Sequence, residues 1–334
     1  MSLIIEQEVD ILEGGSICLS GKKLGEITAG LSNEPVHLKL DAKSERVEFR
    51  AGKFKSKLSG TGAEQFPEIA RGEGEWLKIP VAVFYEGLRR TIFAMTEDKS
   101  RSALNAVLLL LEDSTLKMVT TDWHRLCFFR IAATAGSGQT LRCLIPGKAA
   151  RELKSLLASQ IRVNQKAEIK IRRGSGLEFE IGNKAMAARE LAGAFPNWEM
   201  VIPKIFESFA DINAGQFREA LTCVGVMADD IHRRVDLVFY SDKVLLKSES
   251  PETGNSVEEV GCTFQILQAK ASGQTDDDDG WKIAFNTKYL MDFINSARRD
   301  EQRIVWEFTG QAQTEIMFEG EERLFSYILV ALKA

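Results

Sequence analysis

One short pattern occurs three times along the 334 residues, at long spacing. In each copy an apolar residue typical of a strand leads into a Lys, and a stretch with the apolar periodicity of a helix follows. The copies lie at 19–24, 145–150 and 285–290, and their Lys residues are 126 and 140 positions apart. A repeat of this length is longer than the roughly 20–50 residues of a solenoid, so it indicates tandem copies of a whole domain.

A second marker gives the domain boundaries. Phe66-Pro67 and Phe195-Pro196 lie 129 positions apart, and a polar or Pro-containing stretch follows each of them. We therefore place boundaries near 72 and 204, which predicts units at 1–72, 73–203 and 204–334. The second and third units each hold two halves, and a half consists of one helix followed by strands. The first unit holds a single half.

The elements between these markers alternate regularly. Leu177-Glu178-Phe179-Glu180-Ile181, for example, has the alternation of a half-buried antiparallel strand. One helix followed by three or four sequential strands occurs five times, which predicts an α+β fold with antiparallel sheets. Helices are expected at 22–31, 81–96, 149–158, 214–228 and 288–299. Strands are expected at 36–40, 46–50, 107–111, 115–120, 127–131, 167–171, 177–181, 237–240, 243–247, 304–308 and 315–318.

Composition excludes several classes of protein. The net charge of −5 argues against a protein that coats nucleic acid with its whole surface, although a local basic lining stays open. Five Cys without a C-x-x-C pair favour reduced thiols in a cytoplasmic protein over disulfides or a zinc site. The N-terminus has no basic segment of a secretory signal. The sequence also has no dinucleotide-binding or P-loop motif, so neither a cofactor nor a metal is expected.

Two stretches are more specific than any periodicity. Arg101-Ser102-Ala103-Leu104-Asn105-Ala106 precedes Thr121-Asp122-Trp123-His124-Arg125-Leu126. These runs resemble the Arg-x-x-Leu-Asn-Gly and Thr-Asp-Gly-His-Arg-Leu runs in the second domain of the bacterial beta sliding clamp family, the processivity subunit of DNA polymerase III. Residues 195–203 resemble the close of that domain, and residues 285–292 resemble the Asn/Tyr motif of the third. The resemblance covers essentially all 334 residues, in the order of the family.

The resemblance implies the DNA-clamp fold, with three domains of like topology in each subunit. Two subunits close head to tail into a ring around duplex DNA, with helices lining the hole. Such a protein catalyses nothing and needs no cofactor. It tethers the DNA polymerase III alpha subunit, the clamp loader and other proteins that carry clamp-binding motifs, while its own contacts with duplex DNA are non-specific and phosphate-directed.

The family's hydrophobic cleft for short partner peptides maps onto three parts of this sequence. From the residues alone, His124 is expected to pack or cap locally; the resemblance instead assigns it to the cleft. An apolar groove with a few polar groups is typical of a peptide site. The implied cleft residues are Leu104, Thr121, Trp123, His124, Arg125 and Leu126; Pro196, Met200 and Val201; Asn286 and Tyr289; and Ile328, Leu329, Val330, Ala331 and Leu332.

The resemblance also implies a DNA-facing set and a subunit interface. Lys99 and Arg101 lie in a polar loop that the sequence alone favours as a solvated loop; in clamps this loop faces the central hole, which implies phosphate contact. The other DNA-facing residues lie on predicted helices and are Arg89, Arg90, Lys148, Arg151 and Arg218. The residues implied at the interface of the homodimer are Ser56, Leu58, Val226 and Met227.

Three departures from the family pattern bear on function. Trp123 stands where the family has Gly, and the C-terminal Met-Pro-Met-Arg-Leu of the family is Val330-Ala331-Leu332-Lys333-Ala334, without the flexible Met side chains. The chain also shows five helix-plus-strands halves where the comparison predicts six. One alternative is therefore a truncated or paralogous clamp that keeps the peptide cleft but does not close a ring.

Two further readings have less support. Asp122 and His124 suggest an acid/base pair of an α+β enzyme, but no nucleophile motif accompanies them. The run 276–279 suggests calcium, but its spacing does not match an EF-hand loop, so a solvated loop is expected there.

Overall fold

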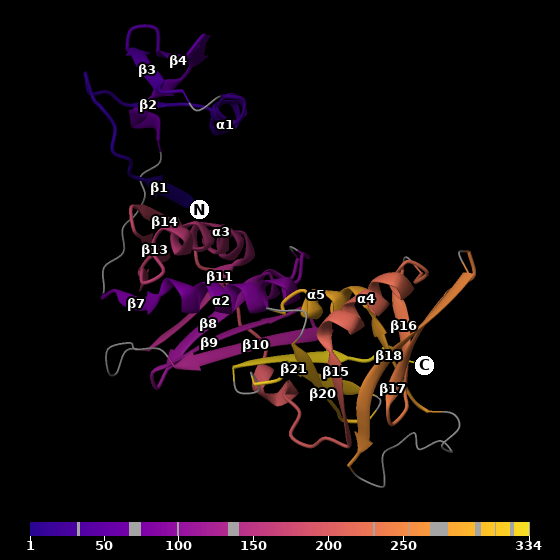
Figure 1. Cartoon of the computed structure of the whole chain (residues 1–334). Coiled ribbons are helices and arrows are strands. Elements are labelled where there is room, and N and C mark those ends of the chain that lie inside the picture. Colours follow the sequence, from indigo (N-terminus) through magenta and orange to yellow (C-terminus); the bar gives the residue numbers. More distant parts are fainter. Residues whose placement is uncertain are drawn as a thin grey trace. The chain divides into compact units, whose positions relative to one another are not determined.

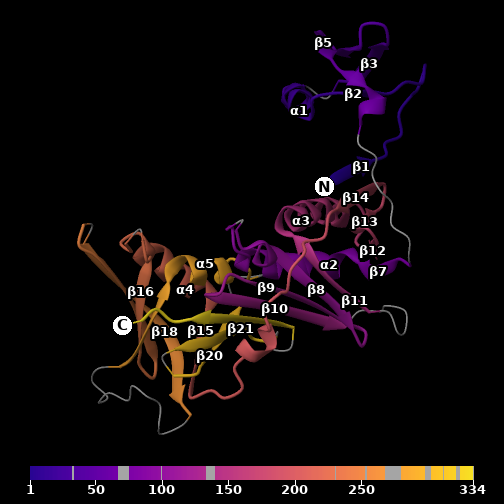
Figure 2. The same cartoon turned by 180° about the vertical axis from the view of Figure 1, so that it is seen from behind.

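The computed structural model describes residues 1–31, 34–66, 75–98, 100–132, 140–229, 231–252, 254–267, 280–297, 302–310, 312–320 and 324–333. The chain divides into two compact units (Figures 1 and 2). Unit 1 comprises Met1–Ile4 with Gly72–Ala334, and unit 2 comprises Ile5–Arg71. Each unit is described by itself.

Among the described residues, one order of elements occurs five times: a strand, a helix and three further strands. We call each copy a module. The first is β2 (Ile17–Cys18), α1 (Gly21–Ala29), β3 (Val36–Asp41), β4 (Arg46–Ala51) and β5 (Phe54–Ser59). The second is β7 (Leu77–Pro80), α2 (Val81–Thr91), β8 (Ala106–Glu112), β9 (Thr115–Thr121) and β10 (Arg125–Ala132). The third is β11 (Leu141–Pro146), α3 (Gly147–Val163), β12 (Glu168–Arg173), β13 (Leu177–Ile181) and β14 (Lys184–Ala188).

The fourth module is β15 (Ser208–Asn213), α4 (Ala214–Gly225), β16 (Arg234–Phe239), β17 (Lys243–Ser250) and β18 (Gly254–Ile266). The fifth is β19 (Trp281–Asn286), α5 (Thr287–Ile294), β20 (Arg303–Phe308), β21 (Gln313–Phe318) and β22 (Phe325–Val330). Strands β1 (Ser2–Ile5) and β6 (Thr61–Gly62) lie outside the modules. The registered strand pairs are antiparallel, so the predicted α+β class with five helix-plus-strands halves is confirmed.

Modules in unit 1 exchange their first strands in pairs. β7 of the second module pairs with β12 of the third, and β11 of the third pairs with β8 of the second. The fourth and fifth modules do the same through β15 with β20 and β19 with β16. The helices of each pair also pack together, α2 on α3 and α4 on α5. Two modules therefore complete each other, since the first strand of each extends the sheet of the other.

One strand pair joins the two halves of unit 1. β10 pairs with β22, with Leu126 opposite Ile328, and this extends one sheet to twelve strands in the order β11-β8-β9-β10-β22-β21-β20-β15-β18-β17-β16-β19. The other large sheet has the order β1-β14-β13-β12-β7. Because β10 and β22 are about 200 residues apart in the chain, this pair brings distant segments into one site.

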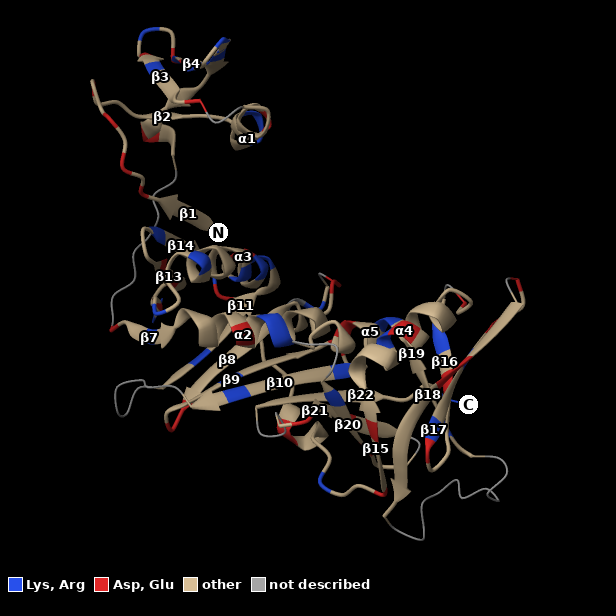
Figure 3. Ribbon diagram, in the orientation of Figure 1, with Lys and Arg blue, Asp and Glu red and all other residues tan. Residues whose placement is uncertain are grey.

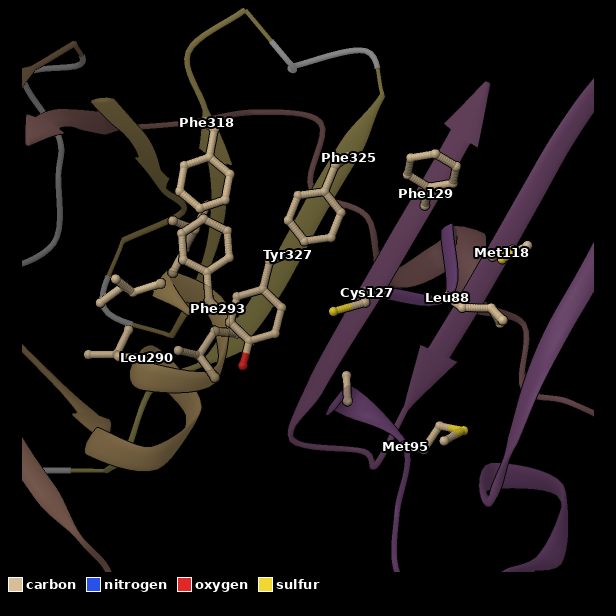
Figure 4. Packing of buried hydrophobic residues seen from close by; sticks show 14 of the residues in the cluster. Leu88, Met95, Met118, Cys127, Phe129, Leu290, Phe293, Phe318, Phe325 and Tyr327 are labelled. Carbon is tan, nitrogen blue, oxygen red and sulfur yellow. The ribbon is translucent and has the colours of Figure 1, made fainter. Parts of the chain in front are cut away.

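The core of unit 1 is continuous across this junction. Phe293 stacks on Phe318 and on Tyr327, with ring centroids 4.6 and 5.3 Å apart. Figure 4 shows these rings beside Cys127 and Phe129 of β10. All five side chains are buried. Stacked aromatic rings bury large apolar areas, so this cluster stabilises the position of α5 relative to β10.

Unit 2 is a single module with little core of its own. Its sheet has the order β3-β4-β5, and β2 pairs with β6. Helix α1 begins after the N-cap Ser20, whose hydroxyl accepts a hydrogen bond from the Lys23 backbone N–H, but none of its residues is buried. Among the described residues of unit 2, the buried apolar side chains are Val47, Phe49 and Ala51, all on β4.

Several predicted ends of elements were wrong. α2 ends at Thr91 and continues as a 3-10 turn over Ile92–Ala94, and α4 and α5 end at Gly225 and Ile294. The predicted boundary at 72 and the acidic run 276–279 lie outside the described residues. The boundary at 204 stays a prediction, as does the three-domain division. In the part of the chain that the structure describes, no helix is long and apolar enough to cross a membrane.

Candidate functional site

A small pocket of about 50 Å³ lies over the junction of β10 and β22. Three segments meet there: the turn and strand that follow β9, the loop and 3-10 turn that end at Val201, and β22. Its floor includes the cross-strand pair Leu126 and Ile328, which are 3 % and 1 % exposed. The lining residues are Thr121, Trp123, Arg125, Leu126, Pro196, Trp198, Val201, Ile328 and Val330.

The rim of the pocket exposes large apolar side chains. Trp123 is 59 % exposed, Val330 43 % and Val201 42 %. Gln313 of β21 donates a 2.7 Å hydrogen bond from Nε2 to the Val201 carbonyl, which fixes the 3-10 turn against the sheet. A concave apolar floor with exposed apolar walls is the arrangement expected of a surface that binds apolar side chains of a partner.

The turn between β9 and β10 is held by its own polar side chains. The Asp122 carboxylate accepts hydrogen bonds from the backbone N–H groups of His124 and Arg125, at 3.0 and 3.1 Å. The Thr121 hydroxyl donates to the Arg125 carbonyl at 2.7 Å and accepts from the Trp123 N–H at 3.2 Å. This closure places Trp123 at φ +78°, a left-handed conformation that is costly for a residue with a side chain.

Arg125 connects the pocket to the third predicted domain. Its guanidinium forms ion pairs with Asp122 at 2.9 Å and with Asp292 of α5 at 2.7 Å, and it donates to the Phe93 carbonyl at 2.7 Å. It also lies 4.3 Å from the centre of the Tyr289 ring. Burial disfavours the charged form of Arg125, but the groups around it, Tyr327 and Asp292 foremost, outweigh this and raise its pKa.

Asn286 and Tyr289 make the contacts that position α5. The Asn286 side chain accepts from the backbone N–H groups of Lys288 and Tyr289 and donates to the His232 carbonyl at 2.9 Å. The Tyr289 ring stacks with His124 at 6.4 Å. Both residues were implied as cleft residues, but neither lines the pocket; their contacts orient the helix that carries Asp292.

Other implied cleft residues also lie outside the pocket. Leu104 is buried in the core, and Met200 is 81 % exposed on the outside of the 3-10 turn. Leu329 is buried opposite Arg125. Ala331 and Leu332 are half-buried, and their N–H groups donate to the carbonyls of Ala312 and Ala284.

Trp198 was missed. It lines the pocket, is 6 % exposed and packs against Phe128 with the rings tilted and their centroids 4.8 Å apart. The available signal was its position two residues after Pro196, inside the segment that carries the resemblance.

The DNA-facing set divides into exposed and anchored residues. Lys148 and Arg151 are exposed on α3, where Figure 3 shows basic residues. Arg101 is exposed and lies 3.6 Å from Asp98. Arg89 donates to the Ser296 carbonyl at 2.7 Å, and Arg218 donates to the Ile294 carbonyl at 3.3 Å, so both are engaged by backbone beside α5. Lys99 lies outside the described residues.

The assignment of Arg90 to the DNA-facing set was wrong. Its side chain is 1 % exposed, it pairs with Glu86 at 2.9 Å, and its guanidinium lies 5.1 Å from the centres of the Phe318 and Phe325 rings. A guanidinium enclosed by two aromatic rings and a carboxylate is a core group, so it has no access to a phosphate.

The implied interface residues belong to two units. Ser56 and Leu58 are half-buried on β5, opposite Phe49 and Val47 of β4. In unit 1, Val226 is 72 % exposed at the end of α4, and Met227 is half-buried. Their role in dimerisation stays a prediction.

Comparisons with known proteins point to one family along most of the chain. A family model for the central domain of the DNA polymerase III beta subunit matches residues 78–197, and one for its C-terminal domain matches residues 199–331. The beta sliding clamp of Synechocystis is 28 % identical over 308 residues, which cover 86 % of this chain and 75 % of the relative. That of Staphylococcus epidermidis is 27 % identical over 334 residues, covering 98 % and 82 %.

Solved structures share the fold. The DNA polymerase III beta subunit of Thermotoga maritima superposes with a TM-score of 0.86 at 20 % identity, covering 99 % of this chain and 85 % of that one. The Pseudomonas aeruginosa beta subunit gives 0.83 at 23 % identity, covering 98 % and 84 %. The chain therefore belongs to the bacterial beta sliding clamp family, the non-catalytic processivity subunit of DNA polymerase III in DNA replication.

Proposed function

We propose that this protein acts as a clamp on duplex DNA and tethers partner proteins through the pocket over β10 and β22. The partners have the chemistry of short linear peptides with bulky apolar side chains, such as those of the polymerase alpha subunit and the clamp loader. The observation that carries this proposal is the exposed apolar rim of Trp123, Val201 and Val330 around a buried floor. We further propose a cytoplasmic location and a homodimer that encircles DNA head to tail.

The contact with DNA is expected to be weak and non-specific. Lys148 and Arg151 on α3 are exposed, whereas the chain as a whole carries a net charge of −5. A few basic groups facing phosphates, in a molecule that is otherwise acidic, allow movement along the duplex without base recognition. The topology of a ring, and not affinity, then supplies retention on DNA.

A charged substitution on the rim tests whether the pocket binds partner peptides. Val330→Asp places a carboxylate that must be desolvated against an apolar partner, so the dissociation constant of a fluorescent clamp-binding peptide should rise at least tenfold, or about 1.4 kcal/mol. Val330 is exposed, so the variant should fold normally. The control is Val163→Asp, the same change at a residue that is 83 % exposed at the end of α3. Equal peptide affinity for both variants would refute the site.

A second candidate function is an interaction module that keeps the pocket without closing a ring. It is favoured by unit 2, which is a single module with few buried apolar residues among those described. Peptide binding without retention on circular DNA would support this alternative.

A further inference from the structure

One side of the three-stranded sheet β3-β4-β5 in unit 2 is strongly basic, and Figure 3 shows Lys and Arg on its strands. Residues 36–59 contain seven Lys and Arg against three Asp and Glu, in a chain whose net charge is −5. The other side carries the buried Phe49 and Ala51 and lies toward α1, since Ala51 and Phe54 line one groove with residues of that helix. The basic side therefore faces away from α1. We call five of its exposed residues the basic face: His37, Lys39, Arg50, Lys55 and Lys57.

Like charges lie side by side in the basic face. Arg50 is directly opposite Lys55 on β5, and on its other side it is directly opposite His37 on β3. Its guanidinium donates a 2.7 Å hydrogen bond to Glu48 on its own strand. Two cations directly opposite one another destabilise a sheet, so this row costs stability that the fold itself does not require. Such a departure from the local rules of a sheet is expected at a functional surface.

The two carboxylates on this side of the sheet do not neutralise it. Glu48 is opposite both Lys39 and Lys57, so cations of both neighbouring strands share one carboxylate. Asp41 is opposite Arg46 and holds the turn after β3, where it accepts hydrogen bonds from two backbone N–H groups and a hydroxyl. Among the described residues of this side, Lys and Arg therefore outnumber Asp and Glu by five to two.

The sheet of the third module has the same order of elements, but its corresponding side is charge-balanced. Lys170 and Arg172 of β12 are opposite Glu180 and Glu178 of β13, and these pairs form ion pairs at 3.1 and 2.6 Å. The Lys170 and Glu180 side chains are 44 % and 40 % exposed, so this side of the sheet is open to solvent as well. An exposed sheet in this fold therefore does not need an excess of positive charge, and the excess on β3-β4-β5 calls for an anionic partner.

We propose that the basic face binds the phosphate groups of duplex DNA. This contact goes beyond the proposed ring, in which helices and not sheets face the DNA. Alternate residues of a strand are about 6.7 Å apart, so the cations on β3 and β5 can meet several charges of a polymer that carries one charge per nucleotide. The described residues of the face include no aromatic ring other than His37 on which a base could stack, which favours a duplex over a single strand. The choice of DNA as the polyanion rests on the proposed function, since a clamp works on duplex DNA, but the contact itself needs no closed ring.

A contact of this kind depends steeply on salt. If the face neutralises about four phosphates, the association constant should fall on the order of a hundredfold as the salt rises from about 0.05 to about 0.2 M. The basic face therefore does not by itself hold the protein on DNA at the higher salt concentration. Retention by a closed ring can then be measured separately from this contact.

The basic face is tested by a triple variant of the full chain, Lys39→Gln with Lys55→Gln and Lys57→Gln. All three residues are exposed, and the pair of Glu48 with Arg50 is left intact. Binding to a fluorescein-labelled duplex of about 20 base pairs is followed by anisotropy over a range of salt concentrations. At about 0.05 M salt the dissociation constant should rise about tenfold or more, and the slope of its logarithm against the logarithm of salt should decrease in magnitude by about two to three.

The matched control removes the same charge from the sheets of unit 1. Lys170→Gln with Lys243→Gln and Lys247→Gln changes three Lys on the solvent side of β12 and β17, two of which pair with Glu180 and Glu259. This control should change the dissociation constant of the duplex less than about twofold. Because both triple variants lose three positive charges, a difference between them reports the position of the charges and not the net charge.

Equal dissociation constants for the two triple variants would overturn the inference. So would a native chain that does not bind the duplex at low salt, or one that binds a single-stranded oligonucleotide or phosphatidylserine vesicles more tightly than the duplex. Retention on circular DNA at higher salt separates this contact from the ring, because the triple variant of the basic face should be retained as well as the native chain. If the native chain is not retained, the proposed ring fails, and the duplex measurement at low salt still decides for or against the basic face.

Discussion

Arg125 is the residue that fixes the candidate pocket across the junction between the two halves of unit 1. It binds Asp122 next to its own strand and Asp292 on α5, and it stacks on Tyr289. Its side chain is 5 % exposed, so the two carboxylates would lose their counter-charge in a poorly solvated site if it were removed. The pocket therefore depends on the ion pairs that Arg125, one of its lining residues, forms with carboxylates on both sides of the junction.

We expect Arg125→Ala to destabilise unit 1 by about 3 kcal/mol, because it removes a buried guanidinium and leaves two half-buried carboxylates without their counter-charge. Arg125→Lys should recover only part of this loss, since an ammonium cannot make the forked contacts with both carboxylates and stack on the ring. Urea unfolding followed by Trp fluorescence measures the loss. If Arg125→Lys were as stable as the native chain, the planar geometry of the guanidinium would not matter.

At this scale, the resemblance located the segments of the pocket but not the role of each side chain. The lining residues other than Trp198 were all implied, because the runs 121–126 and 196–201 and the last strand carry the motif. The assignment of Arg90 to the DNA-facing set was wrong because helical periodicity and a basic side chain do not indicate which face of a helix is buried. Trp123 is a large side chain at φ +78°, and no local pattern predicts a residue in that conformation.

Helix α2 combines a close approach to the sheet with a network of charges. A Cβ on Gly87 would lie 2.6 Å from the Met118 sulfur and 3.0 Å from a Phe129 ring carbon. Gly87 thus allows the helix to contact β9 and β10 closely, and this contact positions the strands that carry the pocket.

Gly87→Ala should therefore destabilise the protein by about 1–3 kcal/mol, because overpacking outweighs the better helix propensity of Ala. Gly225→Ala in α4 is the control, since its nearest neighbour would be the Thr287 Cβ at 3.9 Å. This control should be neutral or more stable by up to about 1 kcal/mol. Thermal unfolding of the two variants gives the comparison, and a stabilised Gly87→Ala variant would contradict the packing.

The same helix makes stability depend on acid pH. Burial acts to raise the pKa of Glu86, but the hydrogen bonds and charges of Arg89 and Arg90 outweigh it and lower the pKa from 4.5 to about 2. A carboxyl whose pKa is depressed on folding contributes stability above pH 4.5 and loses it as the pH falls toward 2, by an amount on the order of 3 kcal/mol.

Replacing this carboxyl should make the free energy of unfolding less dependent on pH between 4.5 and 2. We expect Glu86→Gln to be less stable than the native chain at pH 7, and the difference to shrink as the pH falls from 4.5 to 2. Glu112→Gln is the control, because its carboxylate is about half exposed and lies 3.5 Å from Lys117 on the surface. Parallel pH curves for Glu86→Gln and the native chain would exclude the network as the cause.

Element prediction succeeded where periodicity is local. The five helices and the eleven predicted strands are all present, but the first strands of the modules, such as β15 and β19, were not predicted as strands. Burial alternates along β15, but its buried positions include Ser208 and Ala210 while the half-buried Phe209 lies between them, so the sequence lacks the alternation of hydrophobicity that marks a half-buried strand. Their exchange between modules could not be predicted either, because pairing partners far apart in sequence leave no trace in local periodicity.

At the scale of the whole molecule, function depends on whether copies of the chain enclose DNA. The chain has a net charge of −5, so it should not adhere to DNA at physiological salt through electrostatics alone. Long-lived association with a closed circle would then require topology. A complex held by topology differs from one held by phosphate contacts in a measurable way, since it is lost when the circle is cut and is little affected by salt.

The decisive measurement is retention on nicked circular DNA after loading by a clamp loader. If a head-to-tail ring closes, the protein should co-elute with the circle through gel filtration at 0.2 M salt and separate from it after a restriction enzyme makes the DNA linear. Val226→Asp, at a residue that is 72 % exposed, should abolish retention while leaving peptide affinity unchanged, whereas Val163→Asp should change neither. Retention on linear DNA would mean that affinity holds the protein. Peptide binding without retention on either form would mean that the pocket works as an interaction module, because the pocket lies within unit 1 and does not require a closed ring.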